Sequence, residues 1–515
     1  MEKVEAPVAT DAARVDSPSD ELPPIDQIEK GFWDRLTPVI ACGAGLFSDG
    51  YLNNVIGSVN TILSSYLYVE RYAKSSAAQN VASISFAGNV VGILLFAYTS
   101  DHYSRKWSLL ASTIILIIFA ALAAGSYGAG GSIDGMFSAL AAYRFFLGIG
   151  IGGEYPAGSV GCAETSGELK AGTRNRWFIA FTNVQIDFGF VVAAFVPLVL
   201  VWICGMGHLR LVWRLSLGLG VIPPLSLLWL RIKLKEPEEF RRQTMRNTKT
   251  PYWLAIKFYG YRLFMVSLIW FIYDFSTYSF GIYSSKIVNV VLGANQPLWK
   301  SFGWNVVINL FYMPGAVLGS FVSDWIGPRR ALGYGVFAQA VVGFIMAGCY
   351  PHLATPHYVA AFVVVYGIFL SLGEVGPGDN IGLVASKTCA TSIRGQYYGI
   401  AAAFGKIGAY VGTRTLSLIV KHDNGSKGYQ IPFYISSSLC VLSAFFALFL
   451  LPEIKQDTIT MEDVRFREYL ESQGYDTTKM GVKELQGESL SSLDGGVLGS
   501  PELVAETEEG KKPGL

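Results

Sequence analysis

Residues 143–164 read YRFFLGIGIGGEYPAGSVGCAE, an apolar and glycine-rich stretch that nevertheless contains ionisable side chains such as Arg144 and Glu154. Ionisable groups are rare inside membrane helices and usually serve a function there. Pro156 has no N–H and removes a helical hydrogen bond, which predicts a bend at the Gly-Gly pair that precedes Glu154. Transporters form binding sites at such breaks, because irregular backbone is tolerated where it lines a cavity. The stretch therefore predicts a bent membrane helix with functional residues at Glu154 and Tyr155.

The glycines in this stretch also have a simpler explanation. Gly148 and Gly152 are four residues apart, so they lie on one helix face and allow a second helix to approach closely. We expect this packing role for both glycines. It does not explain an acidic side chain at Glu154.

The rest of the chain has the composition of a membrane protein. Its 515 residues are 51% hydrophobic and 15% charged, whereas soluble domains contain about 25% charged residues. The 40 basic and 39 acidic residues nearly balance, which argues against a nucleic-acid-binding surface. The six cysteines are scattered and form no CxxC pair, so we predict neither a metal site nor a cofactor.

Twelve apolar segments predict an all-α membrane protein with twelve transmembrane helices. They lie near 36–62, 81–100, 107–127, 138–160, 177–203, 211–230, 261–283, 302–322, 331–350, 358–380, 396–419 and 431–451. A charged linker divides them into two six-helix bundles. The predicted organisation is an N-terminal tail (1–35), a first bundle (36–230), the linker (231–260), a second bundle (261–452) and a C-terminal tail (453–515).

Lysine and arginine are distributed unevenly among the predicted loops. The loops after the second, fourth, sixth, eighth and tenth segments carry more of them than the loops in between. Because positively charged loops tend to stay in the cytoplasm, both tails and the linker are predicted to be cytoplasmic. We expect the plasma membrane as the location.

The two halves carry a similar loop at matching places. AYTSDHYSRK follows the second segment and GSFVSDWIGPRR follows the eighth. Both resemble the loop signature of the major facilitator superfamily, G-x-x-x-D-x-x-G-R-[RK], although the first copy lacks its glycines and the second contains an extra proline. A solvated acid–base loop is the alternative interpretation. The resemblance implies the fold of that superfamily and a gating role for Asp101, Arg105, Asp324 and Arg329, to which we add Arg144.

Equivalent positions in the two halves can be matched by their spacing, since such repeats hold the substrate between them near the middle of the membrane. Asp101 lies 52 residues after Asp49, and Asp324 lies 50 residues after Asp274. Asp49 and Asp274 are therefore predicted to face one cavity from opposite walls.

The proline-containing segments supply another matched pair. Gln185 follows Pro156 by 29 residues, and Lys406 follows Pro377 by 29. We predict that Gln185 and Lys406 face the same cavity. Asp187 is either a site residue or the partner of a buried base, and the sequence does not decide between these roles.

The seventh segment has the clearest polar face. Trp270, Asp274 and Tyr278 are each four residues apart and lie on one helical stripe. Aromatic stripes are usually ordinary packing, but an unpaired carboxylate is costly in lipid. We therefore interpret the stripe as part of a binding site.

These residues favour proton-coupled transport of an anion. Acidic side chains buried near a site can exchange protons at physiological pH, and we assign proton coupling to Asp49, Glu154 and Asp274. Lys406, with Tyr155, Gln185, Trp270 and Tyr278, offers donors to an anion such as phosphate. The predicted substrate-binding residues are Tyr155, Gln185, Trp270, Asp274, Tyr278, Asp379, Asn380 and Lys406. The sequence shows no nucleophile–base pair and no phosphate-binding loop, so we predict that the protein is not an enzyme.

The motif GIGIGGEYPAGS is similar to GxGxGGDYP in the fungal phosphate:proton symporters. The resemblance covers nearly the whole membrane core. It implies roles in proton coupling or substrate binding for Asp49, Glu154, Tyr155, Gln185, Trp270, Asp274, Tyr278 and Lys406.

The tenth segment departs from that group. Its G-P-N motif, whose Asn contacts phosphate, reads Gly-Pro-Gly here and ends at Gly378, followed by Asp379 and Asn380. The missing side chain at Gly378 is expected to leave space beside the phosphate. In this respect the chain resembles the fungal glycerophosphodiester permeases, which implies uptake of glycerophosphoinositol or glycerophosphocholine with a head group near Asp379 and Asn380.

Two alternatives stay open. Inorganic phosphate could be the substrate, with Asn380 replacing the missing contact, or the chain could be a transporter-like nutrient sensor that signals through its tails. Sugar uptake is disfavoured because the sixth segment ends in KLKEPEEF rather than PESPR. The expected partners are a small phosphodiester or phosphate anion, protons and the lipid bilayer. We expect no nucleic acid and no required oligomer.

Overall fold

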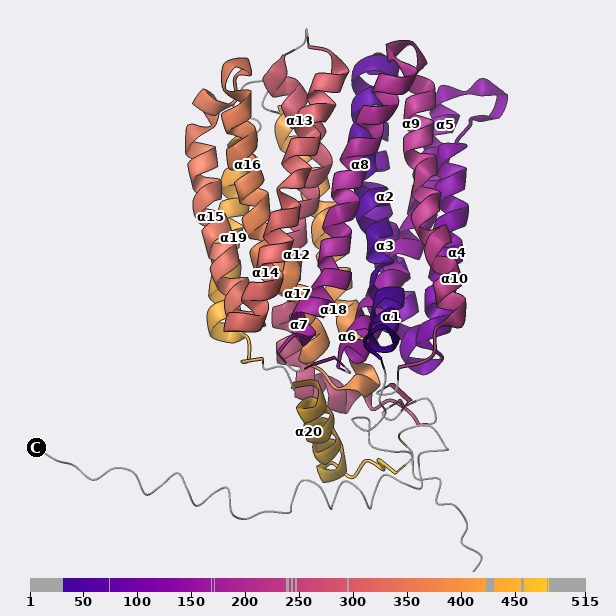
Figure 1. Ribbon diagram of the computed structural model, residues 1–515, viewed down its shortest axis with the longest axis vertical. Coiled ribbons are helices and arrows are strands. Elements are labelled where there is room, and N and C mark those ends of the chain that lie inside the picture. The colour runs from indigo at the N-terminus through magenta and orange to yellow at the C-terminus, as the bar shows by residue number, and fades with distance from the viewer. Residues whose placement is uncertain are drawn as a thin grey trace, which may run out of the picture. The chain divides into compact units, whose positions relative to one another are not determined.

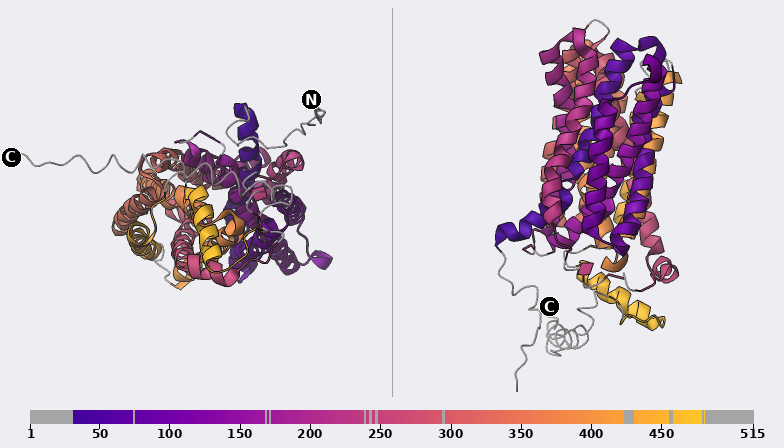
Figure 2. Two further views of the ribbon diagram at one scale, coloured as in Figure 1. Left: turned by 90° about the horizontal axis from the view of Figure 1, so that it is seen from below. Right: turned by 90° about the vertical axis from the view of Figure 1, so that its right-hand side faces the viewer.

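The computed structural model describes residues 31–480, except 74, 168, 171, 238–239, 242–243, 246–247, 294–295, 423–429, 455–457 and 479. Most of both predicted tails lies outside the described residues. Within these residues the regular secondary structure is helical (Figures 1 and 2). This confirms the all-α prediction.

Each of the twelve predicted segments coincides with one helix or with consecutive helices. The helices of the first half are α1 (Phe32–Gly43), α2 (Leu46–Ile62), α3 (Ala77–His102), α4 (Arg105–Ala124), α5 (Ile133–Gly153), α6 (Val160–Ser166), α7 (Arg174–Phe181), α8 (Asn183–Cys204), α9 (Leu209–Gly218) and α10 (Ile222–Lys233). Those of the second half are α12 (Tyr252–Leu292), α13 (Leu298–Leu310), α14 (Tyr312–Ile326), α15 (Pro328–Leu353), α16 (Val359–Gly373), α17 (Asp379–Lys387), α18 (Arg394–His422), α19 (Gln430–Leu450) and α20 (Thr458–Ser472).

Ten helical stretches of the described chain are long and apolar enough to cross a membrane. The first and eleventh predicted segments fall outside this set. In the first segment α2 has 17 residues and contains Asp49, and in the eleventh α18 contains Lys406 and Arg414. The helices with the weakest membrane signal therefore carry candidate site residues.

The linker and the C-terminal tail differ from their predicted limits. α10 continues to Lys233 and α12 begins at Tyr252, so the connection is shorter than predicted, and Arg231 belongs to a helix. The predicted tail includes α20, whose Asp463 carboxylate accepts hydrogen bonds from the Thr391 backbone N–H (2.5 Å) and Oγ1 (2.7 Å). The tail therefore begins with a docked helix, which lies below the bundle in Figure 1.

Glycines allow α3 and α5 to pack backbone against backbone. A Cβ atom on Gly148 would lie 2.1 Å from the Ser85 carbonyl oxygen, and one on Gly152 would lie 2.5 Å from the Asn89 carbonyl oxygen. No side chain fits at such distances. The packing role expected for these two glycines is confirmed.

The segments that contain Pro156 and Pro377 are each interrupted by a π-helical turn. In the first half α5 ends at Gly153 and the turn η5 runs over Glu154–Ser159 before α6. In the second half the turn η9 (Glu374–Gly378) separates α16 from α17. Such turns insert an extra residue and are frequent at functional sites. The predicted interruption of the helix before Pro156 is confirmed.

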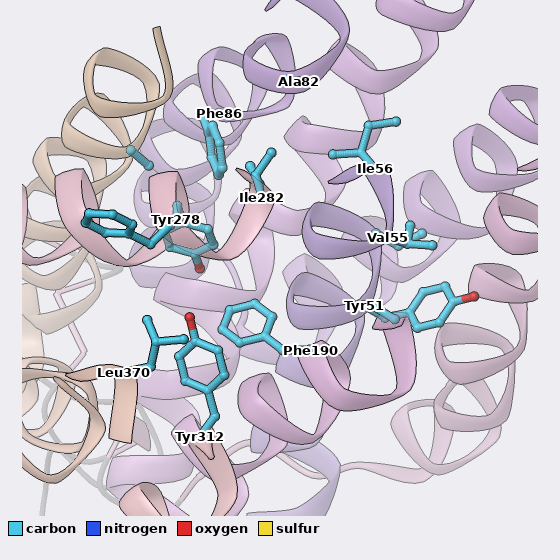
Figure 3. Close-up of a cluster of buried hydrophobic side chains, with 14 of the residues drawn as sticks. Tyr51, Val55, Ile56, Ala82, Phe86, Phe190, Tyr278, Ile282, Tyr312 and Leu370 are labelled. Atoms are coloured by element: carbon cyan, nitrogen blue, oxygen red, sulfur yellow. The ribbon is translucent and has the colours of Figure 1, made fainter. Parts of the chain in front are cut away.

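The two halves of the chain meet along a central seam. In Figure 1 most helices of the first half lie on the right and most helices of the second half lie on the left. α2 packs against α12, α3 against α18, and α8 against α13. At this seam Tyr278 of α12 lies edge-on to Phe86 of α3 and Phe190 of α8, with ring centroids 5.1 and 6.1 Å apart (Figure 3). The candidate site lies in this seam.

Candidate functional site

The centre of the site is the carboxylate of Asp49 on α2, which is fully buried. Its Oδ2 accepts hydrogen bonds from the hydroxyl groups of Tyr155 on η5 and Tyr278 on α12, the latter at 3.1 Å. Asn53, one helical turn later, donates to Oδ1 at 2.5 Å. Residues from both halves of the chain therefore share one buried acid.

Lys406 of α18 supplies positive charge at the same point and is also buried. Its Nζ lies 3.2 Å from Asp274 Oδ2 and 3.9 Å from Asp49 Oδ2, and it donates to the Tyr278 hydroxyl at 2.6 Å. The same ammonium group lies 4.7 Å from the centre of the Tyr155 ring, a geometry that favours a cation. The structure thus brings Asp49, Asp274 and Lys406 together; Asp274 and Lys406 line the adjoining cavity, whereas Asp49, which was predicted to face it, lies just outside its lining.

The stripe on α12 faces this cluster as predicted. Trp270, Asp274 and Tyr278 all line a cavity that lies beside Lys406. The indole of Trp270 packs against the rings of Tyr155 and Tyr398, with centroids 6.3 and 5.3 Å apart. The aromatic residues thus form walls, and the polar groups between them point inward.

The cavity has a volume of about 50 Å³. Such a space holds a few water molecules and is much smaller than a phosphodiester with its head group. The structure therefore shows the site closed around its own side chains.

A second polar cluster, which the sequence suggested only in part, lies along the same cavity. Asn183 of α8 donates to Glu374 Oε2 at 2.8 Å, to Asp379 Oδ1 at 2.9 Å and to Asp187 Oδ2 at 3.4 Å. The Tyr273 hydroxyl donates to Glu374 at 3.0 Å. Asp187, which the sequence left open, lines the cavity together with Asp379.

Glu374, Asn183 and Tyr273 were missed by the sequence analysis. Glu374 lies three residues before Pro377, much as Glu154 lies two before Pro156. That parallel was the available signal. Asn183 precedes Asp187 by one helical turn, and Tyr273 adjoins Asp274. Listing the polar residues on each helix face would therefore have identified both.

Glu154 lies outside the lining of this cavity, contrary to the site predicted for it. Arg231 of α10 binds it through two hydrogen bonds of 2.6 Å, one to each carboxylate oxygen. Ser112 also donates to Glu154, at 3.1 Å. Gln185, which was also predicted at the site, lies outside the cavity lining as well. It is half-buried and donates to the Ala180 carbonyl, because Asp187 occupies the cavity-facing side of α8.

The tenth segment also differs from its prediction. Asn380 accepts a hydrogen bond from Ser323 at 2.6 Å and donates to the backbone oxygens of Val375 and Gly376, so its amide is committed to helix packing. The space expected at Gly378 is occupied: a Cβ atom there would lie 2.0 Å from Glu374 Oε2 and 2.7 Å from the Tyr273 hydroxyl.

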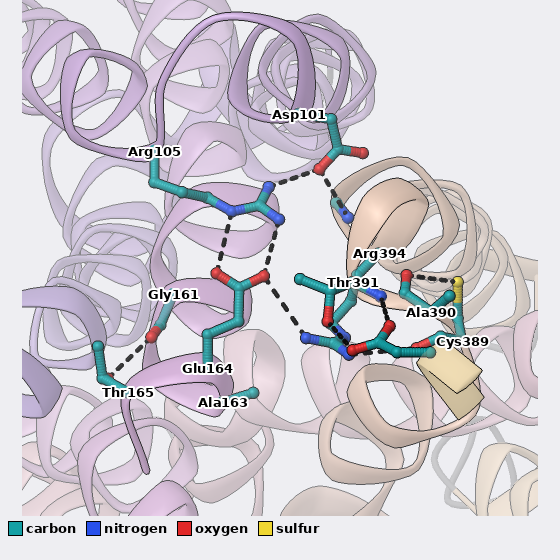
Figure 4. Close-up of polar contacts among 12 residues, drawn as sticks. Asp101, Arg105, Gly161, Ala163, Glu164, Thr165, Cys389, Ala390, Thr391 and Arg394 are labelled. Carbon is teal, nitrogen blue, oxygen red and sulfur yellow. Dashed lines mark hydrogen bonds and ion pairs between the residues drawn. The ribbon is translucent and has the colours of Figure 1, made fainter. Parts of the chain in front are cut away.

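The first copy of the loop signature joins the two halves at one end of the bundle (Figure 4). Arg105 donates to Asp101 at 2.6 Å and to Glu164 at 2.9 Å. Glu164 also lies 3.5 Å from Arg394 of the second half. Asp101 in turn accepts hydrogen bonds from the Gly395 and Gln396 backbone N–H groups, at 3.0 and 2.7 Å. We name these side chains the loop-end network: Asp101, Arg105, Glu164 and Arg394.

The second copy also joins the two halves, because Asp324 forms hydrogen bonds with the backbone of Asn175 and Arg176 in the first half. Asp324 lies 3.9 Å from Arg176 of the first half, and Lys387 donates to Asn175 at 2.6 Å. Arg329 donates to the Leu448 carbonyl, within its own half. The acids of the two copies therefore have similar backbone partners across the seam, whereas Arg105 is paired with acids and Arg329 with a carbonyl.

Arg144 and Arg414 lie outside the cavity lining. The buried guanidinium of Arg144 donates to the Val81 and Leu52 carbonyls at 2.8 and 3.1 Å, which ties α5 to α3 and α2. Arg414 donates to Asn80 at 2.5 Å and so connects α18 with α3. Both contacts hold helices together; the gating role predicted for Arg144 stays a prediction.

Comparison with known proteins agrees with this architecture. Residues 37–249 and 235–466 match the family described as sugar (and other) transporters. A solved proton:xylose symporter of the major facilitator superfamily superposes with a TM-score of 0.67 at 18% identity, covering 84% of this chain and 98% of the symporter. That likeness shows the fold, which implies twelve helices.

Two relatives from Candida albicans are much more similar in sequence. A glycerophosphocholine permease is 52% identical over 87% of this chain and 84% of its own length. A major glycerophosphoinositol permease is 50% identical over 90% and 88%, respectively. The chain therefore belongs to the sugar (and other) transporter family of the major facilitator superfamily, in the group of fungal glycerophosphodiester permeases.

Proposed function

We propose that the protein takes up a glycerophosphodiester together with protons by alternating access. The observation that carries the proposal is the buried arrangement of Lys406 with Asp49 and Asp274, closed by the hydroxyl groups of Tyr155 and Tyr278. A lysine ammonium that is already neutralised by acids can bind an anion only if those acids give up part of their charge.

Proton coupling follows from this competition. Asp274 and Asp49 hold the ammonium of Lys406 while the site is empty. Protonation of either acid would release the ammonium for an incoming phosphodiester and would remove the repulsion between two anions. Coupled acids titrate as a set, so the proton belongs to the Asp49–Asp274 pair.

Alternating access would use the two halves as rocking units. Six helices on either side of the seam form the proposed bundles, and the loop-end network closes one end of the seam. We place this end, with both termini and the linker, in the cytoplasm of a plasma-membrane protein. Opening the network would release the substrate inward.

The first test is uptake by cells that lack their own phosphate and phosphodiester transporters. Labelled glycerophosphocholine and glycerophosphoinositol would be supplied at acidic and neutral pH, with excess inorganic phosphate as a competitor. Faster entry of a diester at acidic pH, with little competition by phosphate, supports the proposal. Entry of phosphate alone would favour the phosphate symporter, and no entry of any substrate would favour a sensor.

Two variants connect this measurement to the site. Lys406→Met should abolish uptake, whereas Lys257→Met, at an exposed lysine of α12, should leave uptake unchanged. Asp274→Asn should remove the acceleration by acid, because it removes one proton acceptor. Full uptake by the Lys406 variant would contradict the proposed site.

A further inference from the structure

The cavity has two chemically different poles. One is Lys406 with its surrounding tyrosines. The other is a group of three carboxylates that we call the acidic pole: Asp187, Glu374 and Asp379. Asp187 comes from the first half of the chain and the other two come from the second half. Tyr273 and Asp274, adjacent on α12, each serve one pole: Tyr273 donates to Glu374 and Asp274 pairs with Lys406.

The acidic pole lies in the same cavity as Lys406. Asp187, Asp379 and Lys406 all line the cavity, and Glu374 stands behind Gly378 in its wall. Asp187 and Asp379 are each 1% exposed. One oxygen of each, Asp187 Oδ1 and Asp379 Oδ2, receives no hydrogen bond from any described residue. Asp379 Oδ2 packs against Gly319 of α14, where a Cβ atom would lie 2.1 Å from it, so Asp187 Oδ1 is the oxygen that remains for a ligand.

The acids of this pole have no basic partner among the described residues. No lysine or arginine in the described part of the chain forms an ion pair with these three acids. Burial of unpaired carboxylates is unfavourable, and an anionic substrate with a neutral head group would add a further negative charge. A substrate that carries its own cation would instead neutralise the pole.

Aromatic rings complete a site suited to a large, weakly hydrated cation. Phe178 and Tyr273 line the same cavity as Asn183 and Asp187, as does Phe190, whose ring packs against Tyr278. Rings combined with carboxylates are the usual surroundings of quaternary ammonium groups, which donate no hydrogen bonds and rely on cation–π attraction. Because such a group donates no hydrogen bonds, it can lie beside a carboxylate oxygen that receives none.

We propose that the acidic pole binds a quaternary ammonium head group while Lys406 binds the phosphodiester, so that the preferred substrate is zwitterionic, as glycerophosphocholine is. This inference rests on the proposed function and adds a substrate class to it. The head group would lie between Asp187 of one half and Asp379 of the other, and its binding would draw the two halves together.

The test is a comparison of three substrates in the same uptake assay. Glycerophosphocholine carries the cation and glycerophosphoinositol does not. The third is an isostere of glycerophosphocholine in which a carbon atom replaces the quaternary nitrogen, which keeps the shape and removes the charge. The wild-type protein should favour glycerophosphocholine over the isostere about tenfold or more, as expected for a desolvated cation at aromatic and acidic groups.

The variants Asp187→Asn, Glu374→Gln and Asp379→Asn should each reduce this preference. Glycerophosphocholine uptake should fall about tenfold, and uptake of the isostere and of glycerophosphoinositol should change about twofold or less. Glu468→Gln, at an exposed position of α20, is the matched control and should change neither. Size-exclusion profiles of the three variants identify any that fail to fold, and one folded variant is sufficient.

Two results would overturn the inference while leaving the proposed function intact. The first is equal competition by glycerophosphocholine and its uncharged isostere in the wild-type protein. The second is an equal loss of charged and uncharged substrates in the amide variants, which would assign the acidic pole to protons. Failure of the wild-type protein to take up any diester would instead reject the proposed function itself.

Discussion

Glu154 and Glu374 occupy similar places in the two halves but have opposite surroundings. Each begins a π-helical turn that contains a proline, and each is buried. Arg231 binds Glu154 with both arms of its guanidinium at 2.6 Å. Glu374 has instead the hydroxyl of Tyr273 and the amide of Asn183.

The difference shows that, within the described chain, one local motif can hold a glutamate with a basic partner in one half and without one in the other. A π-helical turn places a carboxylate inside the bundle, and the neighbouring helices decide whether its charge is neutralised. The Glu154–Arg231 pair fastens α10 to η5. Glu374 has no basic partner in the part of the chain that the structure describes, and it lies next to the cavity, where a cationic substrate group or a proton can neutralise its charge.

The largest expected effect comes from breaking the balanced pair. Arg231→Met should lower the free energy of unfolding by about 3–5 kcal/mol, because it leaves Glu154 buried without a counter-charge. Thermal unfolding of the purified protein in detergent would measure this loss. The double variant Glu154→Gln/Arg231→Met should recover most of it. A single variant as stable as the wild-type protein would show that Glu154 is not held by charge.

A smaller effect is expected at Glu164, which two arginines share. Glu164→Gln should weaken the contacts to Arg105 and Arg394 and favour opening at this end of the seam, by about 1.5–3 kcal/mol. The buried thiol of Cys389, in the chain segment just before Arg394, should then react with maleimide about tenfold faster or more. Mass spectrometry would locate the label. Unchanged labelling, as expected of the control Glu468→Gln, would argue against a gate here.

A still smaller effect on stability is expected for Glu374→Gln. The amide retains oxygen and nitrogen atoms for Tyr273 and Asn183 and loses no ionic partner, so the free energy of unfolding should change by about 1 kcal/mol or less. The same unfolding assay compares it directly with Arg231→Met. Equal losses in the two variants would remove the distinction between the halves.

The smallest effect is expected at an exposed ion pair. Arg330 and Glu453 lie 3.1 Å apart, and their side chains are 59% and 62% exposed. Arg330→Ala should change the free energy of unfolding by about 0.5 kcal/mol or less, because water screens the pair. A loss comparable to that of Arg231→Met would show that burial does not determine how much an ion pair contributes to the free energy of unfolding.

Much of the fold followed from the sequence. Apolar runs located all twelve membrane segments, and the prolines located both interruptions. Spacing between the halves brought Asp49, Asp274 and Lys406 together correctly, because equivalent residues of a repeat lie at the same depth. The loop signatures likewise placed Asp101 and Arg105 where the halves meet.

The errors arose where helix orientation or a distant partner mattered. Gln185 and Asp187 differ by about 200° around α8, so both cannot face the cavity, and spacing alone could not choose between them. Arg231, which neutralises Glu154, is 77 residues away in the chain and was assigned to the linker. At Gly378 the absence of a side chain suggested space, but Glu374 and Tyr273 occupy it.

Because the closed cavity is too small for the substrate, the measured affinity depends on how often the cavity opens. A substrate enters only the fraction of molecules that are open, so the apparent dissociation constant equals the intrinsic constant divided by that fraction. Under the proposed alternating access, residues of the loop-end network, remote from the cavity lining, would therefore change the apparent affinity by changing this population. Tight binding and selectivity would then be controlled from different ends of the molecule: the network would set how often the site is available, and the cavity would set which substrate it retains.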